Sequence, residues 1–351
     1  MRAWLDALVA LVVAAAAAGG AGAGPATGAS PAETLVVAVF EDETIAFSEA
    51  APGRGAAAGV TVEDNGRVVA RTVAVEPPAS CTRIVARVTT RPVPKDEVSV
   101  HDPWDRAGCV RLSVHGAPDV ELVKFVTAYG GETTHEADVT ALAPLLRGEC
   151  ALRGFVDTWL SPAWRMDFAL VFETGPEPAL DGVPTTPPAD AADWVLPLLY
   201  EESVTTERLA NGPVAVAVTV PPGTGRVVLR YLVSGHCTDG RDADEFVSKD
   251  NVVVVDGAEV ERFRPWRDDC RRFREVNPYT RRWSDGWWSS DYSRSGWCPG
   301  DRVPPRLVDL SGVLAPGPHT VSFHVEGVRP RDEDGHFGYW RVSAALLGWM
   351  E

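Results

Sequence analysis

Short runs rich in valine and threonine recur along the chain, and turn-forming glycine, proline and aspartate separate them. Examples are TLVVAVF from Thr34, GRVVARTVAV from Gly66 and TRIVARVTTRPV from Thr82. β-Branched residues favour strands, and many short strands without alternating helices indicate antiparallel β-sandwiches. A helical turn is expected at Asp138–Leu146, and Asp256-Gly257 between two strand-like runs predicts a hairpin.

A proline-rich stretch near the middle of the chain indicates where two such sandwiches are joined. The sequence ETGPEPALDGVPTTPPADAA, from Glu173 to Ala192, holds five prolines and no hydrophobic periodicity, which is typical of a linker. The length of 351 residues also exceeds that of one ordinary domain. We therefore expect domains at 34–176 and 194–351, a linker at 177–193, and a binding site in the groove between the domains.

The first residues have the features of an export signal. Arg2 precedes an apolar run from Leu8 to Ala18, and the small residues Ala21–Ala23 fit a cleavage site. The apolar run is too short to span a membrane as a helix. We expect a signal peptide at 1–23 and a secreted or periplasmic protein.

Charge and cysteine content narrow the choice of partners. The formal net charge of −16 argues against nucleic acid and against stable association with an anionic membrane, and we expect a monomer. Six cysteines fit an exported chain with disulfides, and the close Cys or His spacing of a zinc site is absent from the sequence. We expect neither a metal nor a cofactor.

The segment 263–300, called here the Trp-rich segment, is too broken by Gly, Pro and Asp for a regular helix or strand. Its tryptophans are Trp266, Trp283, Trp287, Trp288 and Trp297. Indole rings normally enter cores or interfaces, so some of these rings are expected to pack on their own domain. Others, beside Arg and Asp, would suit a sugar-binding groove, where a flat ring stacks on the sugar and charged groups bind its hydroxyls.

Two cysteines lie near the ends of the Trp-rich segment. A disulfide between Cys270 and Cys298 would close it into one loop, which is worth about 3–4 kcal/mol in the chain-entropy model. Three pairings then stay open for the remaining cysteines, which are Cys81, Cys109, Cys150 and Cys237.

Acidic residues next to tryptophan are the candidates for chemistry. Asp105 lies between Trp104 and Arg106, Asp157 precedes Thr158-Trp159 near a strand end, and Glu245 follows an acidic loop. A structural Asp–Arg pair is the simpler interpretation of Asp105. If carboxylates from both halves meet in the groove, however, crowding would raise at least one pKa and permit acid–base catalysis. Asp239, Asp242 and Asp244 would form either a solvated charge run or a calcium site.

Several spaced motifs together resemble the peptide-N-glycosidase F family, amidases that remove N-linked glycans from asparagine. The motifs are Trp104-Asp105-Arg106, Asp157-Thr158-Trp159-Leu160, Ser234-Gly235-His236, Asp244-Glu245-Phe246 and Ser293-Arg294-Ser295-Gly296-Trp297-Cys298-Pro299-Gly300. The resemblance covers about 102–300, and its last block is the most specific. It implies an all-β fold of two adjacent antiparallel eight-stranded jelly-roll sandwiches, with the active site in the groove between them.

The resemblance also assigns residue roles. Asp105 takes the place of the principal catalytic aspartate, Glu245 that of a second essential carboxylate, and Asp157 stands where the family has a glutamate. The residues at positions that would contact substrate are Trp104, Arg106, Trp159, His236, Arg294 and Trp297. The Cys270–Cys298 pair matches a family disulfide. The implied substrate is an N-glycoprotein or glycopeptide, which would be hydrolysed to a glycosylamine and aspartate without a cofactor.

Two other classes of function remain as alternatives. A non-catalytic carbohydrate- or protein-binding jelly-roll pair would keep the Trp-rich groove after losing turnover, since Asp157 is one methylene shorter than glutamate. A copper-dependent monooxygenase of similar architecture would need clustered His and a Met ligand. Apart from Met1, the chain has only Met166 and Met350.

Overall fold

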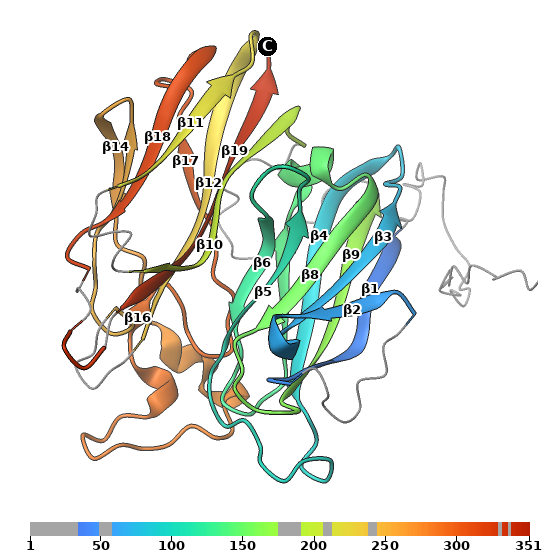
Figure 1. Cartoon of the computed structure of the whole chain (residues 1–351), viewed down its shortest axis with the longest axis vertical. Coiled ribbons are helices and arrows are strands. Elements are labelled where there is room, and N and C mark those ends of the chain that lie inside the picture. Colours follow the sequence, from blue (N-terminus) through green and yellow to red (C-terminus); the bar gives the residue numbers. More distant parts are fainter. Residues whose placement is uncertain are drawn as a thin grey trace, which may run out of the picture. The chain divides into compact units, whose positions relative to one another are not determined.

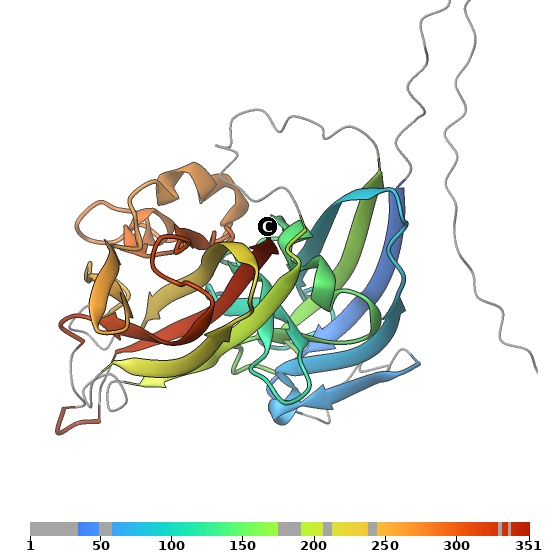
Figure 2. The same ribbon diagram turned by 90° about the horizontal axis from the view of Figure 1, so that it is seen from above.

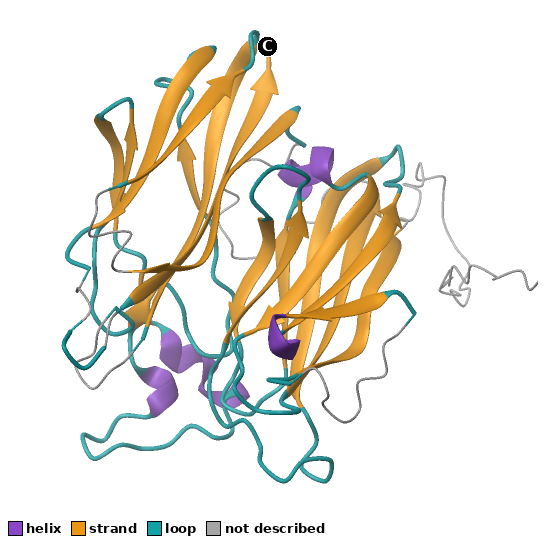
Figure 3. Cartoon of the chain, in the orientation of Figure 1, coloured by secondary structure: helices purple, strands orange, loops and turns teal. Residues whose placement is uncertain are grey.

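The structure, a computed structural model, describes residues 34–48, 58–174, 191–205, 213–237, 244–328, 332–335 and 338–351. These residues form antiparallel strands with a few short 3₁₀ helices, as Figure 3 shows. The predicted signal peptide and nearly all of the predicted linker lie outside the described residues. In the part of the chain that is described, no helix is long and apolar enough to cross a membrane.

The first sandwich packs a four-stranded sheet, in the order β1-β9-β4-β7, against a five-stranded sheet, in the order β2-β3-β8-β5-β6 (Figure 1). Its strands are β1 (Thr34–Ile45), β2 (Val60–Glu63), β3 (Val68–Val75), β4 (Cys81–Pro92), β5 (Ala107–Ser113), β6 (Val120–Val126), β7 (Thr133–Asp138), β8 (Gly148–Val156) and β9 (Trp164–Thr174). The helix η1 (Asp64–Gly66) joins β2 to β3, and η2 (Thr140–Leu145) forms the helical turn expected from the sequence.

The second sandwich packs the sheet β10-β19-β12-β17 against the sheet β11-β18-β13-β14. Its strands are β10 (Trp194–Thr205), β11 (Val214–Val220), β12 (Thr224–His236), β13 (Asn251–Val255), β14 (Ala258–Phe263), β17 (Arg306–Asp309), β18 (Gly317–Val325) and β19 (Tyr339–Met350). The Trp-rich segment adds the small β15 (Trp266–Arg267) and β16 (Arg294–Ser295) pair, with η3 (Cys270–Val276) and η4 (Ser289–Asp291) between them.

One strand order occurs twice. Without β2, the sheets β1-β9-β4-β7 and β3-β8-β5-β6 have the same sequential order as β10-β19-β12-β17 and β11-β18-β13-β14, which is a jelly-roll order. The expected all-β jelly-roll pair is therefore confirmed. Among the described strands the first sandwich has nine rather than eight, because the short edge strand β2 extends its second sheet. The domain boundaries given above stay a prediction.

Local sequence explains the strands and their turns. In β7, alternate residues of TTHEAD are buried and exposed, as expected for a sheet with one face on the core. Asp256 and Gly257 join β13 to β14 with φ values of 49° and 85°, so the predicted hairpin is confirmed with the backbone that a type I′ turn requires. Large fully buried rings, including Trp164 and Trp340, fill the two cores.

Residues 32–351 form one compact unit, and buried cationic side chains join its two sandwiches. Arg230 of β12 donates to the backbone oxygens of Glu121 and Leu122 in β6, at 2.7 and 3.2 Å. In the opposite direction, Lys124 of β6 donates to the backbone oxygen of Arg341 in β19 at 2.8 Å. Charged donors on backbone acceptors make strong hydrogen bonds, so these contacts hold β12 and β19 against β6. Figure 2 shows the two sandwiches side by side, seen from above.

The connections that carry most candidate residues lie at one edge of the molecule. Figure 1 shows the connection between β4 and β5, in teal, beside the Trp-rich segment, in orange, at the lower edge. Backbone hydrogen bonds join this part of the second sandwich to the end of β6 and the β6–β7 connection, from Tyr279 N to Tyr129 O at 3.0 Å and from Val126 N to Asp301 O at 3.0 Å. The candidate site is built where they meet.

Candidate active site

Arg294 contacts two acidic side chains, one from each sandwich. Its Nε lies 3.3 Å from Glu245 Oε1, and its Nη2 lies 3.6 Å from Asp105 Oδ2. Asp105 lies in the connection between β4 and β5, and Glu245 lies in the connection between β12 and β13. The two acids predicted from sequence are therefore brought together, with the predicted arginine between them.

Arg294 is buried beneath the two acids, with a side chain only 1% exposed. Its Nη2 donates to the Ser289 backbone oxygen at 2.8 Å and to the Tyr129 hydroxyl at 3.1 Å, and its Nη1 donates to the Tyr292 backbone oxygen at 2.9 Å. The guanidinium also lies over the rings of Phe246 and Trp297, 5.0 and 4.8 Å from their centroids. This orientation makes Arg294 a holder of the acids rather than a surface contact for substrate.

Burial is the largest influence on the pKa of Asp105 in this cluster. Burial raises the pKa of Asp105, and the nearby positive charge of Arg294 opposes that rise only in part. Burial and the neighbouring Asp105 also raise the pKa of Tyr129 well above its usual range. Burial would lower the pKa of Arg294, but Tyr129 and the two acids outweigh it and raise that pKa. Asp105 Oδ2 is buried without a hydrogen-bond partner among the described residues, which is common at functional sites.

Arg106 forms an ion pair with the buried Asp102. Its Nε lies 3.0 Å from Asp102 Oδ2, and its Nη2 lies 3.0 Å from Asp102 Oδ1. Asp102 is fully buried and also accepts hydrogen bonds from Thr158 Oγ1 at 2.8 Å and Trp164 Nε1 at 3.3 Å. This ion pair fixes the connection just before β5 and so positions Asp105, and the predicted substrate contact of Arg106 stays a prediction.

Asp157 is the third predicted acid, and two arginines hold it. Arg67 Nη1 lies 3.0 Å from its Oδ1, and Arg341 Nη2 lies 2.7 Å from its Oδ2. Its backbone N–H donates to Ala107 O at 2.9 Å, which places it beside the start of β5. Asp157 thus joins the first sandwich to β19 of the second, in the neighbourhood of Asp105.

Two predicted aromatic contacts are exposed near the acids. Trp104 is 53% exposed and Trp159 is 57% exposed, so each presents a ring to solvent. The Trp159 ring packs against Phe47 at 5.0 Å between centroids, and the Arg67 guanidinium lies 5.0 Å from its centroid. These supports hold the Trp159 ring in place without covering it fully.

Two other predicted contacts are buried, which corrects the expectation from the sequence. Trp297 is 2% exposed and donates from Nε1 to the Gly235 backbone oxygen at 2.8 Å. His236 is also buried, stacks on Trp297 at 5.4 Å between centroids, and lies 2.8 Å from Ser234 Oγ through its Nε2. Burial and nearby Arg341 and Lys124 lower the pKa of His236 well below its usual range. Both rings form the floor under Arg294 rather than a surface for substrate.

The predicted Cys270–Cys298 disulfide is confirmed, with a Cα–Cα distance of 5.1 Å. It joins two parts of the Trp-rich segment, and Cys298 lies four residues after Arg294. Cys81 and Cys150 are free thiols, and each of the three open pairings would use both of them, so none of the three is formed.

Asp244 does not belong to a solvated charge run. Its side chain is fully buried and forms an ion pair with Lys249. Asp239 and Asp242 lie outside the described residues. Across the described ranges, no group of three His, Cys, Asp or Glu side chains is placed to hold a metal ion.

Tyr129 is a site residue that the sequence analysis missed. Its hydroxyl accepts from Arg294, its backbone oxygen accepts from Tyr279 N, and its backbone N–H donates to Asn277 Oδ1 at 2.8 Å. The only local signal is its place before Gly130-Gly131, just after the buried β6. A tyrosine beside a turn is too common to be identified as a site residue unless its contact with Arg294 is known.

Comparisons with known proteins agree with this architecture. A family model described as "Peptide-N-glycosidase F, C terminal" matches residues 205–347. The chain is 24% identical over 265 residues to peptide-N(4)-(N-acetyl-beta-D-glucosaminyl)asparagine amidase F of Elizabethkingia miricola, covering 70% of this chain and 69% of that protein. The chain is thus similar to the peptide-N-glycosidase F family in sequence and in fold. The resemblance noted from the sequence motifs is thereby confirmed.

Solved structures of the family have the same fold. PNGF-II superposes with a TM-score of 0.74 at 23% identity, over 91% of this chain and 65% of that one. The chain thus spans about two thirds of the length of PNGF-II. PNGase F, a glycosylasparaginase from Flavobacterium meningosepticum, superposes with a TM-score of 0.68 at 18% identity, over 91% of this chain and 96% of that one.

Proposed function

We propose that this protein is a secreted amidase that hydrolyses the bond between asparagine and the first sugar of N-linked glycoproteins. The observation that carries the proposal is the meeting of Asp105 and Glu245 at the buried Arg294, each acid within 3.6 Å of the guanidinium. Similarity to the peptide-N-glycosidase F family supports the same reaction class. The products would be a glycosylamine and a peptide in which aspartate replaces asparagine.

The proposed reaction begins with water bound beside Asp105. The ionised carboxylate takes a proton from this water while the water oxygen attacks the amide carbon, and the carbonyl electron pair moves onto its oxygen. When the tetrahedral intermediate collapses, the C–N bond breaks and Asp105 gives the proton that it took from water to the departing nitrogen. A carboxyl group with a raised pKa suits both steps, because it accepts a proton more readily than an ordinary aspartate.

Glu245 and Arg294 would keep Asp105 in position during these steps. Arg294 binds both acids and is itself held by backbone oxygens of Ser289 and Tyr292, so its guanidinium cannot swing away. A group fixed in this way loses little entropy when the transition state forms. We assign Asp105 and Glu245 to the reacting groups and Arg294 to positioning.

The exposed tryptophans would bind the sugar. Trp104 precedes Asp105 directly, and Trp159 lies two residues after Asp157. An indole face provides an apolar surface for the C–H face of a pyranose ring. Asp157, held by Arg67 and Arg341, would orient a sugar hydroxyl or the tryptophan-bearing connection itself.

The test is incubation of a denatured glycoprotein and a matched glycopeptide with the purified protein. Mass spectrometry should show glycan release together with conversion of the attachment asparagine to aspartate. The Asp105→Asn variant should lose about 100- to 10,000-fold in kcat/KM. Glycan binding by calorimetry without product, in the parent protein after long incubation, would favour the non-catalytic binding alternative.

A further inference from the structure

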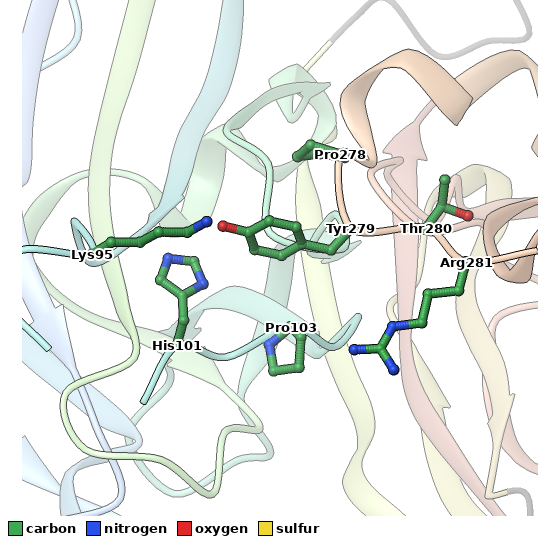
Figure 4. Close-up of a pocket in the computed structure, with 7 residues that line it drawn as sticks. All are labelled: Lys95, His101, Pro103, Pro278, Tyr279, Thr280 and Arg281. Atoms are coloured by element: carbon green, nitrogen blue, oxygen red, sulfur yellow. The ribbon is translucent and has the colours of Figure 1, made fainter. Parts of the chain in front are cut away.

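A pocket of about 420 Å³ lies where the β4–β5 connection meets the Trp-rich segment (Figure 4). Lys95, His101 and Pro103 reach it from the first sandwich, and Tyr279 and Arg281 reach it from the segment. The volume falls in the range of small-ligand sites. Neither Lys95 nor Arg281 was among the candidate residues above.

The pocket is cationic in a strongly acidic protein. No acidic residue is among those that line it, whereas Lys95 and Arg281 approach it from two sides (Figure 4). The nearby Glu97 is held by an ion pair with Arg165. Two cations without a lining carboxylate, in a chain of net charge −16, are suited to an anionic ligand.

The pocket also has a preformed aromatic wall. The Tyr279 ring meets His101 edge-on at 5.3 Å between centroids, and Lys95 Nζ lies 4.6 Å from the ring centroid. A Cβ on Gly130 would lie 1.9 Å from Tyr279 Cδ2, so the ring rests directly on the glycine backbone. His101 Nδ1 is buried and has no hydrogen-bond partner in the described ranges, which often marks a ligand site.

The pocket shares its supporting backbone with the candidate active site. Pro103 precedes Trp104 and Asp105 in the chain, and Tyr279 N donates to the backbone oxygen of Tyr129, whose hydroxyl meets Arg294. The acids and the pocket are therefore built on the same stretches of chain, which suits one extended ligand that contacts both. Ring faces of tyrosine and proline suit sugar C–H groups, and the two cations suit an acidic substituent.

We propose that this pocket binds an anionic sugar residue, bearing a carboxylate, phosphate or sulfate, of the same glycan whose amide bond lies at Asp105. The inference rests on the proposed function for the identity of that glycan. It adds a preference among glycans: acidic ones are bound more tightly than neutral ones, through Lys95 and Arg281.

The first experiment measures kcat/KM on one glycopeptide carrying a neutral, a carboxylated or a phosphorylated glycan. The parent should favour both acidic forms by about tenfold, mainly through KM, and the preference should shrink at high salt because the cations are exposed. The Lys95→Gln/Arg281→Gln double variant should lose the preference and keep its kcat on the neutral glycan. Arg271→Gln, an exposed charge change in the same segment, should keep the preference.

The second experiment measures binding without turnover. Calorimetry of Asp105→Asn with free neutral and acidic oligosaccharides should show tighter binding of the acidic ones, and adding Lys95→Gln and Arg281→Gln should abolish the difference. Equal affinity for neutral and acidic oligosaccharides would overturn the pocket assignment even if glycan release is observed. A preference that follows acidic residues of the peptide rather than of the glycan would also overturn it.

Discussion

The two sandwiches have the same strand order but contribute differently to the site. The β4–β5 connection of the first carries Asp105, and the topologically equivalent β12–β13 connection of the second carries Glu245. The next equivalent pair differs: residues 127–132 join β6 to β7, whereas 264–305 join β14 to β17 and contain Arg294. A repeated scaffold thus places two acids at one edge, and an enlarged connection in only one copy supplies the cation between them.

The connections that carry the site are supported by different contacts in the two sandwiches. In the first sandwich, the ion pair of Asp102 with Arg106 stiffens a short connection. In the second, the Cys270–Cys298 disulfide and the stacked His236 and Trp297 rings support a long one. The longer connection needs more internal support because more backbone must be ordered.

The largest expected effect comes from removing the shared cation. Arg294→Met leaves Asp105 and Glu245 without their buried counter-charge, so the free energy of unfolding at neutral pH should fall by about 3–5 kcal/mol. The value of kcat/KM should fall by about 100- to 1,000-fold. Chemical denaturation and glycopeptide kinetics measure the two effects.

Arg264→Met is the matched control in the same connection. The Arg264 side chain is exposed and pairs with Asp250, so its loss should cost at most about 1 kcal/mol and leave kcat unchanged. Similar costs for both variants would mean that Arg294 is not the centre of the cluster.

The disulfide should be the next largest contributor. The Cys270→Ser/Cys298→Ser double variant should lose about 3–4 kcal/mol in free energy of unfolding, because the bond closes a loop with a sequence separation of 28. Hydrogen exchange should quicken in the Trp-rich segment and not in the first sandwich. As a control, Cys81→Ser should leave the free energy of unfolding and the hydrogen exchange unchanged. If exchange in the double variant quickened equally in both sandwiches, the disulfide would not act on the Trp-rich segment alone.

The pH dependence of stability tests whether burial raises the pKa of Asp105. Because burial raises the pKa of Asp105, its ionised form opposes folding; the penalty is absent below about pH 4, where the unfolded carboxyl is also protonated, and grows as the pH rises. Asp105→Asn removes the penalty, so the variant should become more stable relative to the parent between about pH 4 and neutral pH.

Asp309→Asn provides a control of opposite sign. Hydrogen bonds from Ser311 lower the pKa of Asp309, so its contribution to stability is present above the unfolded pKa and is lost as the pH falls. This variant should be less stable than the parent at neutral pH, with the difference vanishing in acid. A pH-independent stability difference for Asp105→Asn would refute the assigned burial effect.

The smallest effects are expected at the opposite edge of both sandwiches. Gly116 and Gly257, in the equivalent β5–β6 and β13–β14 turns, have φ values of 72° and 85°, and a Cβ added to either would meet open space. Alanine at either position should cost about 1 kcal/mol from backbone strain alone and leave kcat/KM unchanged. A loss of activity in one variant would show that these turns are not equivalent.

The sequence predicted local features and the main cluster well. The strands, the Asp256-Gly257 hairpin and the Cys270–Cys298 bond follow from patterns within short stretches. Asp105, Glu245 and Arg294 were identified because their motifs match a known family. Their convergence agrees with that resemblance, although their catalytic roles stay a prediction.

The direction in which a side chain points was harder to predict. Arg106, His236 and Trp297 lie in the same motifs as the site, yet Arg106 turns to Asp102 and the two rings stack on each other in the interior. Tyr129 was missed because its partners come from the other sandwich. These outcomes depend on contacts distant in sequence, which motif and periodicity do not contain.

The central claim is that two acids from equivalent connections act as one unit around Arg294, and a double-mutant cycle on kcat/KM tests it most directly. Asp105→Asn, Glu245→Gln and the double variant would be compared with the parent on one glycopeptide. If the acids act together, the double variant should lose about as much activity as the more damaging single variant. Losses that multiply as for independent sites, or full activity in Asp105→Asn, would contradict the account.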